Sequence, residues 1–143
     1  MEIVKVTQSI IDNFQMSKED LNEEKASGNT YDFSTIEDSV AVKDGDTILC
    51  LGGITSFHTI WLLCTDDVKQ LKVNKKKQFV KTIWKIVQGF LDDNPDVEYF
   101  YNTVWSGNED HIKFIESCGG IIEYSKGFQT VTGEAFYPFT IRR

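Results

Sequence analysis

One segment, residues 97–122, constrains the fold more than any other part of the chain. Residues 97–104 are rich in aromatic and β-branched side chains, which is typical of a strand. A turn then leads to Asn108, a residue type favoured at the N-cap of a helix. Gly119 suits the left-handed conformation in which many helices end, and an apolar strand follows it. The segment therefore predicts the order strand, Asn-capped short helix, double glycine, strand.

The rest of the chain alternates between strand and helix patterns. Asn74 is expected to N-cap the longest helix, whose lysines and apolar residues occupy opposite faces. An Asp-Gly pair at Asp44 predicts a tight hairpin. The expected strands are 2–7, 39–42, 47–54, 59–65 and 135–141, and the expected helices are 8–26, in two pieces, and 75–91.

The composition predicts one soluble globular domain spanning residues 1–143. Hydrophobic residues make up 41% of the chain and charged residues 26%. No apolar run approaches the roughly 18 residues of a membrane helix, so no membrane partner is expected. The opening residues predict a strand rather than a secretory leader, which indicates an intracellular protein. The net charge of −7 makes nucleic acid a poor general partner.

The charge is unevenly distributed along the chain. Residues 19–46 hold nine acids against two lysines, and residues 69–85 hold seven lysines and no acid. Lysines in the first turn of the long helix oppose the helix dipole at a cost of roughly 0.3–1 kcal/mol each, which a bound anion would relieve. The basic segment is therefore either an anion site or a solvated face. The acidic segment is either a solvated face or a surface for a cationic amine or a basic protein.

The segment at 97–122 and the hairpin before the long helix resemble the GNAT superfamily of acyl-CoA-dependent N-acetyltransferases. The family motif has the approximate form N-x-x-A-x-x-L-Y-E-K-x-G-F, in which Asn108, Phe114 and Gly119 match Asn, Leu and Gly. The resemblance covers essentially the whole chain. It implies an α/β (α+β) GNAT fold with a mixed, mostly antiparallel sheet of six to seven strands and flanking helices. It also implies a V-shaped split between strands 59–65 and 97–104.

A narrower resemblance is to small GNAT-like proteins of podovirus-type tailed bacteriophages, which carry the motif W-x-G-N-x-x-H-I-x-F-[LI]-x-x-x-G. Such proteins are usually described as associated with virion assembly or the internal virion. The resemblance implies a protein in the host cytoplasm or in the virion, with a phage or host protein as its partner. The matching residues are Trp105, Gly107, Asn108, His111, Ile112, Phe114, Ile115 and Gly119.

The GNAT resemblance also implies where acetyl-CoA would bind. The backbone of the central strand would pair with pantetheine at Ile60, Leu62 and Cys64, and Asn108 would assist. The family's phosphate loop is rich in glycine, but the corresponding residues here contain none. The lysines that would replace it are Lys72, Lys75, Lys76 and Lys77.

The general acid of the family is missing from the motif. Ile115 takes the position of the tyrosine that in many members protonates the departing thiolate, and isoleucine has no proton to give. His111 is the candidate for a substitute acid or base, or else it simply packs beside Trp105. The two histidines lack ligand partners at motif spacing, so no metal site is expected.

Two hypotheses therefore follow from the sequence. The first is an acyl-CoA-dependent N-acetyltransferase that acts on an amine acceptor. The second is a non-catalytic GNAT-fold phage protein that serves in virion assembly or binds a host or virion protein. Because one fold can serve many functions, the two hypotheses can be distinguished only by the residues of the functional site.

Overall fold

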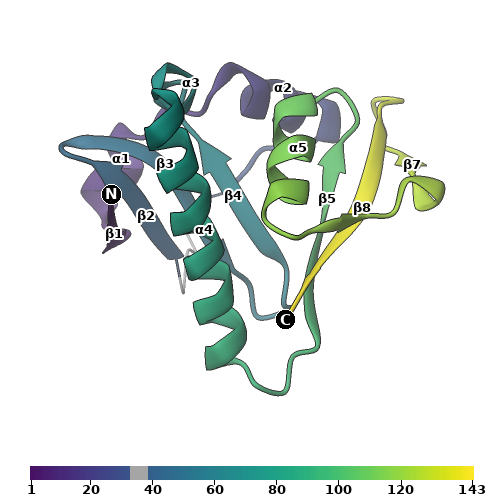
Figure 1. The fold of residues 1–143 in the computed structure, drawn as a ribbon. Coiled ribbons are helices and arrows are strands. Elements are labelled where there is room, and N and C mark those ends of the chain that lie inside the picture. The colour runs from purple at the N-terminus through teal and green to yellow at the C-terminus, as the bar shows by residue number, and fades with distance from the viewer. Residues whose placement is uncertain (33–38) are drawn as a thin grey trace.

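The protein is an α+β molecule whose computed structural model describes residues 1–32 and 39–143 (Figure 1). Two of the acids in the acidic segment, Glu37 and Asp38, lie outside the described residues. Among the described residues, no helix combines the length and the apolar character that crossing a membrane requires.

The first sheet contains four antiparallel strands in the order β1-β2-β3-β4. The hairpin turn between β2 and β3 contains Gly45 at φ 61°, as the Asp-Gly pair predicts. The backbone of β3 approaches β4 closely at Gly52, where a Cβ would lie 3.1 Å from the Trp61 carbonyl oxygen. The strands are β1 (Glu2–Lys5), β2 (Ser39–Asp44), β3 (Thr47–Ile54) and β4 (Ile60–Cys64).

The second sheet is built around the last strand. It has the order β5-β8-β6, and β7 pairs with β8 beside this path, all antiparallel. The strands are β5 (Tyr99–Trp105), β6 (Ile121–Ile122), β7 (Phe128–Gln129) and β8 (Ala135–Arg142). The sequence predicts the strand after Gly119, which is shortened here to β6, whereas β7 is an additional strand of only two residues.

The two sheets meet at one end of β4 and β5 and diverge from there. In the described part of the chain, a single parallel bridge joins Thr59 to Tyr101, and the Tyr101 N–H donates to the His58 carbonyl oxygen at 3.3 Å. Figure 1 shows β4 and β5 spreading apart towards α2. The V-shaped split predicted between these two strands is confirmed.

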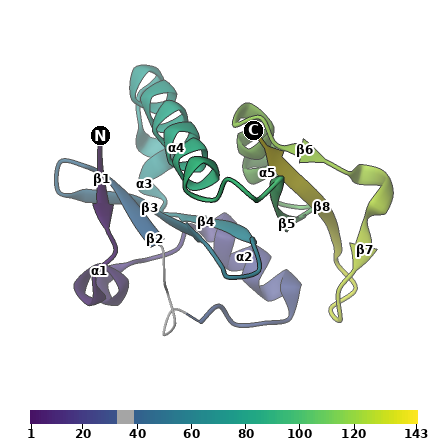
Figure 2. The same cartoon turned by 90° about the horizontal axis from the view of Figure 1, so that it is seen from below.

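Helices cover both faces of the sheets. Figure 2 shows α4 and α5 on one side, and α1 and α2 on the other. The helices are α1 (Gln8–Asn13), α2 (Lys18–Ser27), α3 (Asp67–Gln70), α4 (Val73–Asp93) and α5 (Glu109–Ser117), with a 3-10 turn η1 (Tyr124–Lys126) before β7.

One apolar core lies under the split and joins the two sheets. Helix α4 contributes Phe79, Ile83, Val87 and Leu91, which recur every four residues on one face and are all buried. Burying a side chain of this size stabilises the fold by about 1.5–3 kcal/mol. The same cluster contains Leu49, Cys50, Ile54 and Ile60 of the first sheet and Phe100, Val104, Phe139 and Ile141 of the second.

The observed helix caps agree with the sequence-based prediction at α5 and differ from it at α4. The Asn108 side chain accepts from the His111 N–H at 3.3 Å, and Gly119 has φ 84°, so both predicted ends of α5 are confirmed. The expectation that Asn74 caps α4 is wrong. Lys72 is the N-cap, because its carbonyl oxygen accepts the first helical bond from the Lys76 N–H at 2.9 Å. Asn74 therefore lies inside the first turn.

Candidate functional site

Helix α2 carries two buried carboxylates to the wide end of the split. Asp20 and Glu23 are three residues apart on the helix and share one face. Their side chains are only 6% and 7% exposed. Ser17 starts the helix by accepting from the Asp20 N–H at 3.2 Å, which fixes where these carboxylates point.

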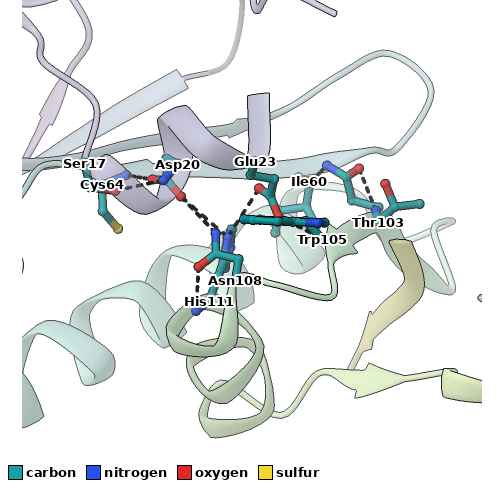
Figure 3. Close-up of polar contacts among 10 residues, drawn as sticks. Ser17, Asp20, Glu23, Ile60, Cys64, Thr103, Trp105, Asn108 and His111 are labelled. Carbon is teal, nitrogen blue, oxygen red and sulfur yellow. Dashed lines mark hydrogen bonds and ion pairs between the residues drawn. The ribbon is translucent and has the colours of Figure 1, made fainter. Parts of the chain in front are cut away.

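The open edge of β4 is occupied by groups from the same chain. The Cys64 N–H donates to Asp20 Oδ2 at 2.7 Å, and the Cys64 carbonyl oxygen accepts from the Ser17 N–H at 2.7 Å (Figure 3). Nearer the narrow end of the split, Asn102 Nδ2 donates to the Ile60 carbonyl oxygen at 2.6 Å. The backbone groups of Ile60 and Cys64 that were expected to pair with pantetheine are thus already bonded within the protein.

Strand β5, which faces β4 across the split, is also hydrogen-bonded to helix α2. The Trp105 N–H at the end of β5 donates to Glu23 Oε1 at 2.7 Å, while the Trp105 indole Nε1–H donates to Glu134 Oε2 at 3.0 Å. Helix α2 therefore bonds to β4 through Asp20 and to β5 through Glu23. These two side chains bridge the strands where the strands themselves no longer pair.

Helix α5 adds Asn108 and His111 to this cluster (Figure 3). Asn108 is 1% exposed, and its Nδ2 donates to Asp20 Oδ1 at 3.4 Å. His111 Nδ1 lies 3.9 Å from Asp20 Oδ1 and 3.8 Å from Glu23 Oε2. Within the described residues this nitrogen is shielded from solvent and has no hydrogen-bond partner. His111 thus faces two acids rather than an open cleft.

Burial and mutual charge shift the ionisation of the cluster. Burial raises the pKa of Asp20, although the charge of His111 and the Cys64 N–H act in the opposite direction. Burial lowers the pKa of His111, but the neighbouring carboxylates of Glu23 and Asp20 outweigh burial, so the pKa of His111 is raised above its usual value. Both directions follow from two carboxylates placed beside one imidazole in a poorly solvated position.

The predicted phosphate-binding lysines lie apart from this cluster, at the start of α4. Lys72, Lys76 and Lys77 are exposed. Lys75 is also exposed, but its Nζ pairs with Asp44 Oδ1 at 2.9 Å. One of the four cations is therefore already matched by a carboxylate of β2.

The acidic segment is largely used inside the protein. Asp20 and Glu23 point into the split, and three other acids of the segment have partners within the protein. These partners are Lys69 for Glu19, the N–H of Tyr31 for Glu24 at 2.9 Å, and Lys75 for Asp44.

Ile115, which takes the position of the missing general acid, is part of the hydrophobic core. Ile115 is 4% exposed and belongs to the apolar cluster. Gly120 has no side chain for a related reason, since a Cβ there would lie 2.4 Å from Ile115 Cγ2. A tyrosine hydroxyl is available nearby at Tyr124, but it donates to Glu116 Oε1 at 2.8 Å on the exposed surface.

Sequence reasoning missed Asp20 and Glu23 as members of the site. Their i, i+3 spacing after the Ser17 cap places them on one helix face, which is a weak signal that many solvated helices share. Burial distinguishes Asp20 and Glu23 from the acids of a solvated helix. The sequence does not indicate this burial, because α2 has no apolar stripe that would mark its inner face.

Comparison with known families decides where the chain belongs. The model of a family described as "Bacteriophage T7, probable scaffold protein Gp13" matches residues 38–126, which is more than half of the chain. The chain belongs to this Gp13 family. A member from Escherichia phage T7, described as "Probable scaffold protein gp13", is 27% identical over 132 residues, covering 91% of this chain and 88% of that protein. The predicted relation to a phage family is confirmed.

Solved structures with the same fold are acetyltransferases. A chimera of spermidine N-acetyltransferase SpeG from Vibrio cholerae and hSSAT superposes with a TM-score of 0.62, covering 99% of this chain and 96% of that one. A SpeG point mutant from Vibrio cholerae gives 0.58, with 99% and 92% coverage. Both are 12% identical to this chain, so they establish the GNAT fold of this Gp13-family protein and no more.

Proposed function

We propose that this protein is a non-catalytic GNAT-fold member of the Gp13 family that acts in phage particle assembly by binding another protein of the virion. The observation that carries the proposal is the occupied split. Asp20, Ser17 and Asn102 bond to backbone groups of Cys64 and Ile60, two of the three β4 residues at which an acyl-CoA would pair, the third being Leu62. To admit the cofactor there, the protein would have to break these part-buried bonds, at a cost of up to about 1–3 kcal/mol for each group left unpaired.

The catalytic inventory supports the same proposal. Transfer of an acetyl group to an amine is accelerated roughly 10²–10⁴-fold by a base for the amine or an acid for the thiolate. Ile115 is apolar, and His111 is held between two buried carboxylates. An imidazole whose pKa is raised by Glu23 and Asp20 spends less time in the neutral form that could accept a proton from an attacking amine. The description of the T7 relative as a scaffold protein agrees with an assembly role.

Calorimetry with acetyl-CoA and desulfo-CoA tests the first half of the proposal. We expect no saturable heat from either compound at concentrations that saturate a spermidine N-acetyltransferase measured in parallel. Saturable binding would instead favour the acetyltransferase hypothesis, which the shared fold keeps as the second candidate. In that case, changing Lys75, Lys76 and Lys77 together to Gln should weaken binding and flatten its salt dependence.

The assembly half is tested in a phage that encodes this chain. A stop codon early in the gene should leave capsid protein synthesis intact and reduce the yield of infectious particles, which sedimentation and plaque counts would measure. Affinity-tagged protein recovered from infected cells, and from purified particles of the same phage, should carry a phage structural protein. Normal infectious yield from the stop-codon phage would contradict the proposal.

A further inference from the structure

We propose that Asp20, Glu23 and His111 form a binding site for one divalent transition-metal ion of the zinc or manganese type, which would link α2 to α5 across the split. The inference does not depend on the assembly role. It also departs from what the sequence predicts, since the ligands come from segments that no spacing motif connects.

The spacing of the three side chains fits a metal ion. Each offers one ligand atom, and these atoms lie within 4.8 Å of one another. Three atoms so spaced can all stand within about 2.8 Å of a common point. Zinc–nitrogen and zinc–oxygen bonds are roughly 2.0–2.2 Å long, so each ligand atom would move inwards by at most about 0.6–0.8 Å. A movement of this size is within the reach of side-chain rotation.

The orientation of both carboxylates is already fixed by backbone donors. Asp20 uses Oδ2 for the Cys64 N–H, and Glu23 uses Oε1 for the Trp105 N–H, at 2.7 Å each. The second oxygen of each acid faces His111 Nδ1, and the one on Asp20 also accepts from Asn108 Nδ2 at 3.4 Å. Metal sites in proteins hold their ligands by outer hydrogen bonds of this kind, which orient the ligand before the ion arrives.

Charge gives the strongest argument for a cation. The carboxylates of Asp20 and Glu23 are more than nine-tenths buried, and ionising both would place a charge of −2 in a poorly solvated position, which is costly unless it is balanced. A protonated His111 would balance only half of this charge. Its Nδ1 stands 3.8 and 3.9 Å from the nearest acid oxygens, beyond hydrogen-bond distance. A divalent ion balances both charges and gives the shielded, unpartnered Nδ1 a bond.

The donor set indicates which ion to expect. One imidazole nitrogen with two carboxylate oxygens suits zinc or manganese better than magnesium, which prefers oxygen ligands and retains its water shell. Since the ligands come from α2 and α5, a bound ion should stabilise the folded state. Ligand binding to the native state alone raises its stability in proportion to the logarithm of the ion concentration.

Thermal unfolding of the full chain after dialysis against EDTA tests the site. Zinc or manganese at micromolar concentration should raise the Tm by several degrees, magnesium at the same concentration should not, and calorimetry should give one ion per chain. Glu23→Gln keeps an oxygen for the Trp105 N–H but removes the charged ligand, and His111→Gln removes the imidazole. Both variants should lose the shift, whereas His58→Asn, which removes the other histidine in a turn where φ is 62°, should keep it.

A spectroscopic experiment distinguishes a metal site from an ion pair between His111 and the two acids. Cobalt(II) added to the EDTA-treated protein should give visible absorption bands that disappear in Glu23→Gln, with circular dichroism showing that the variant is folded. If none of the ions shifts the Tm of the wild-type protein, the cluster is an ion pair between His111 and its acids, and the proposal is overturned. Loss of the shift in His58→Asn would equally overturn it, by placing the ion elsewhere.

Discussion

Gly107 is required by the side chain of Trp105. A Cβ at position 107 would lie 2.5 Å from Trp105 Cζ2 and within 2.7 Å of two further ring atoms. The indole cannot easily move away, because its Nε1–H is bonded to Glu134 and its backbone N–H to Glu23. The spacing of tryptophan and glycine in the motif thus has a packing origin.

Replacing this glycine should therefore cost stability. We expect Gly107→Ala to lower the free energy of unfolding by about 1–3 kcal/mol through overpacking, as measured by urea denaturation. Gly89→Ala is the matched control. It lies in the interior of α4 with nothing within 4 Å of a new Cβ, and alanine there should stabilise the helix by about 0.5–1 kcal/mol. Equal effects at the two positions would refute the packing explanation.

The three cysteines should be nearly inert in the folded protein. Burial raises the pKa of Cys50 to about 12 and that of Cys118 to about 11, and it raises the pKa of Cys64 well above 9.0. Because only the thiolate reacts, the rate with a disulfide reagent at pH 8 should be lower than that of the unfolded chain by about 100-fold or more, and should still rise at pH 9. Cys118→Ser should remove one of three slow equivalents. One thiol reacting at the unfolded-chain rate would contradict this.

At the scale of elements, α2 connects the two sheets through polar bonds. It bonds to β4 through Asp20 and to β5 through Glu23, while its remaining surface is strongly polar. Most helices are held by an apolar stripe, and α2 has Ala26 as its buried apolar residue. Its place in the fold therefore depends on these two carboxylates more than on hydrophobic contact.

Truncating one carboxylate should show this dependence. In EDTA, Glu23→Ala leaves the Trp105 N–H without its acceptor and should lower the free energy of unfolding by about 1–3 kcal/mol. Glu23→Gln retains an amide oxygen in the same place and should lose much less. Urea denaturation of the two variants measures the difference. If alanine and glutamine are equally destabilising, the charge of Glu23 matters and its bond to β5 does not.

The elements themselves were largely predictable, because their signals are local. Asn108 and Gly119 mark the ends of α5 through their own backbone preferences, and both are where the sequence places them. The start of α4 was not predictable in this way. Leu71 ends α3 immediately before it, so the first helical bond forms at Lys72 and overrides the preference of Asn74 for a cap.

At the scale of the whole molecule, the fold was predictable and the content of the split was not. The order of strands and helices gives the GNAT arrangement, and structures only 12% identical share it. The residues that fill the split are brought together from distant segments. Asp20 bonds to Cys64, 44 residues away, and to Asn108, 88 residues away. A chain can thus keep a fold through its hydrophobic pattern while unrelated polar residues decide whether that fold has room for a ligand.

These long separations have a consequence for the way the chain is made. Helix α2 leaves the ribosome early, yet the groups that bond to Asp20 and Glu23 include residues 64, 105 and 108. Cys64 lies in the first sheet, whereas Trp105 and Asn108 come from the C-terminal half of the chain. We therefore expect the burial of the two acids to be complete only once β5 and α5 have joined the core. A chain truncated before β5 would contain Asp20 and Glu23 but would lack Trp105 and Asn108. Burying the two acids would then be unfavourable, so the truncated chain should not form this cluster.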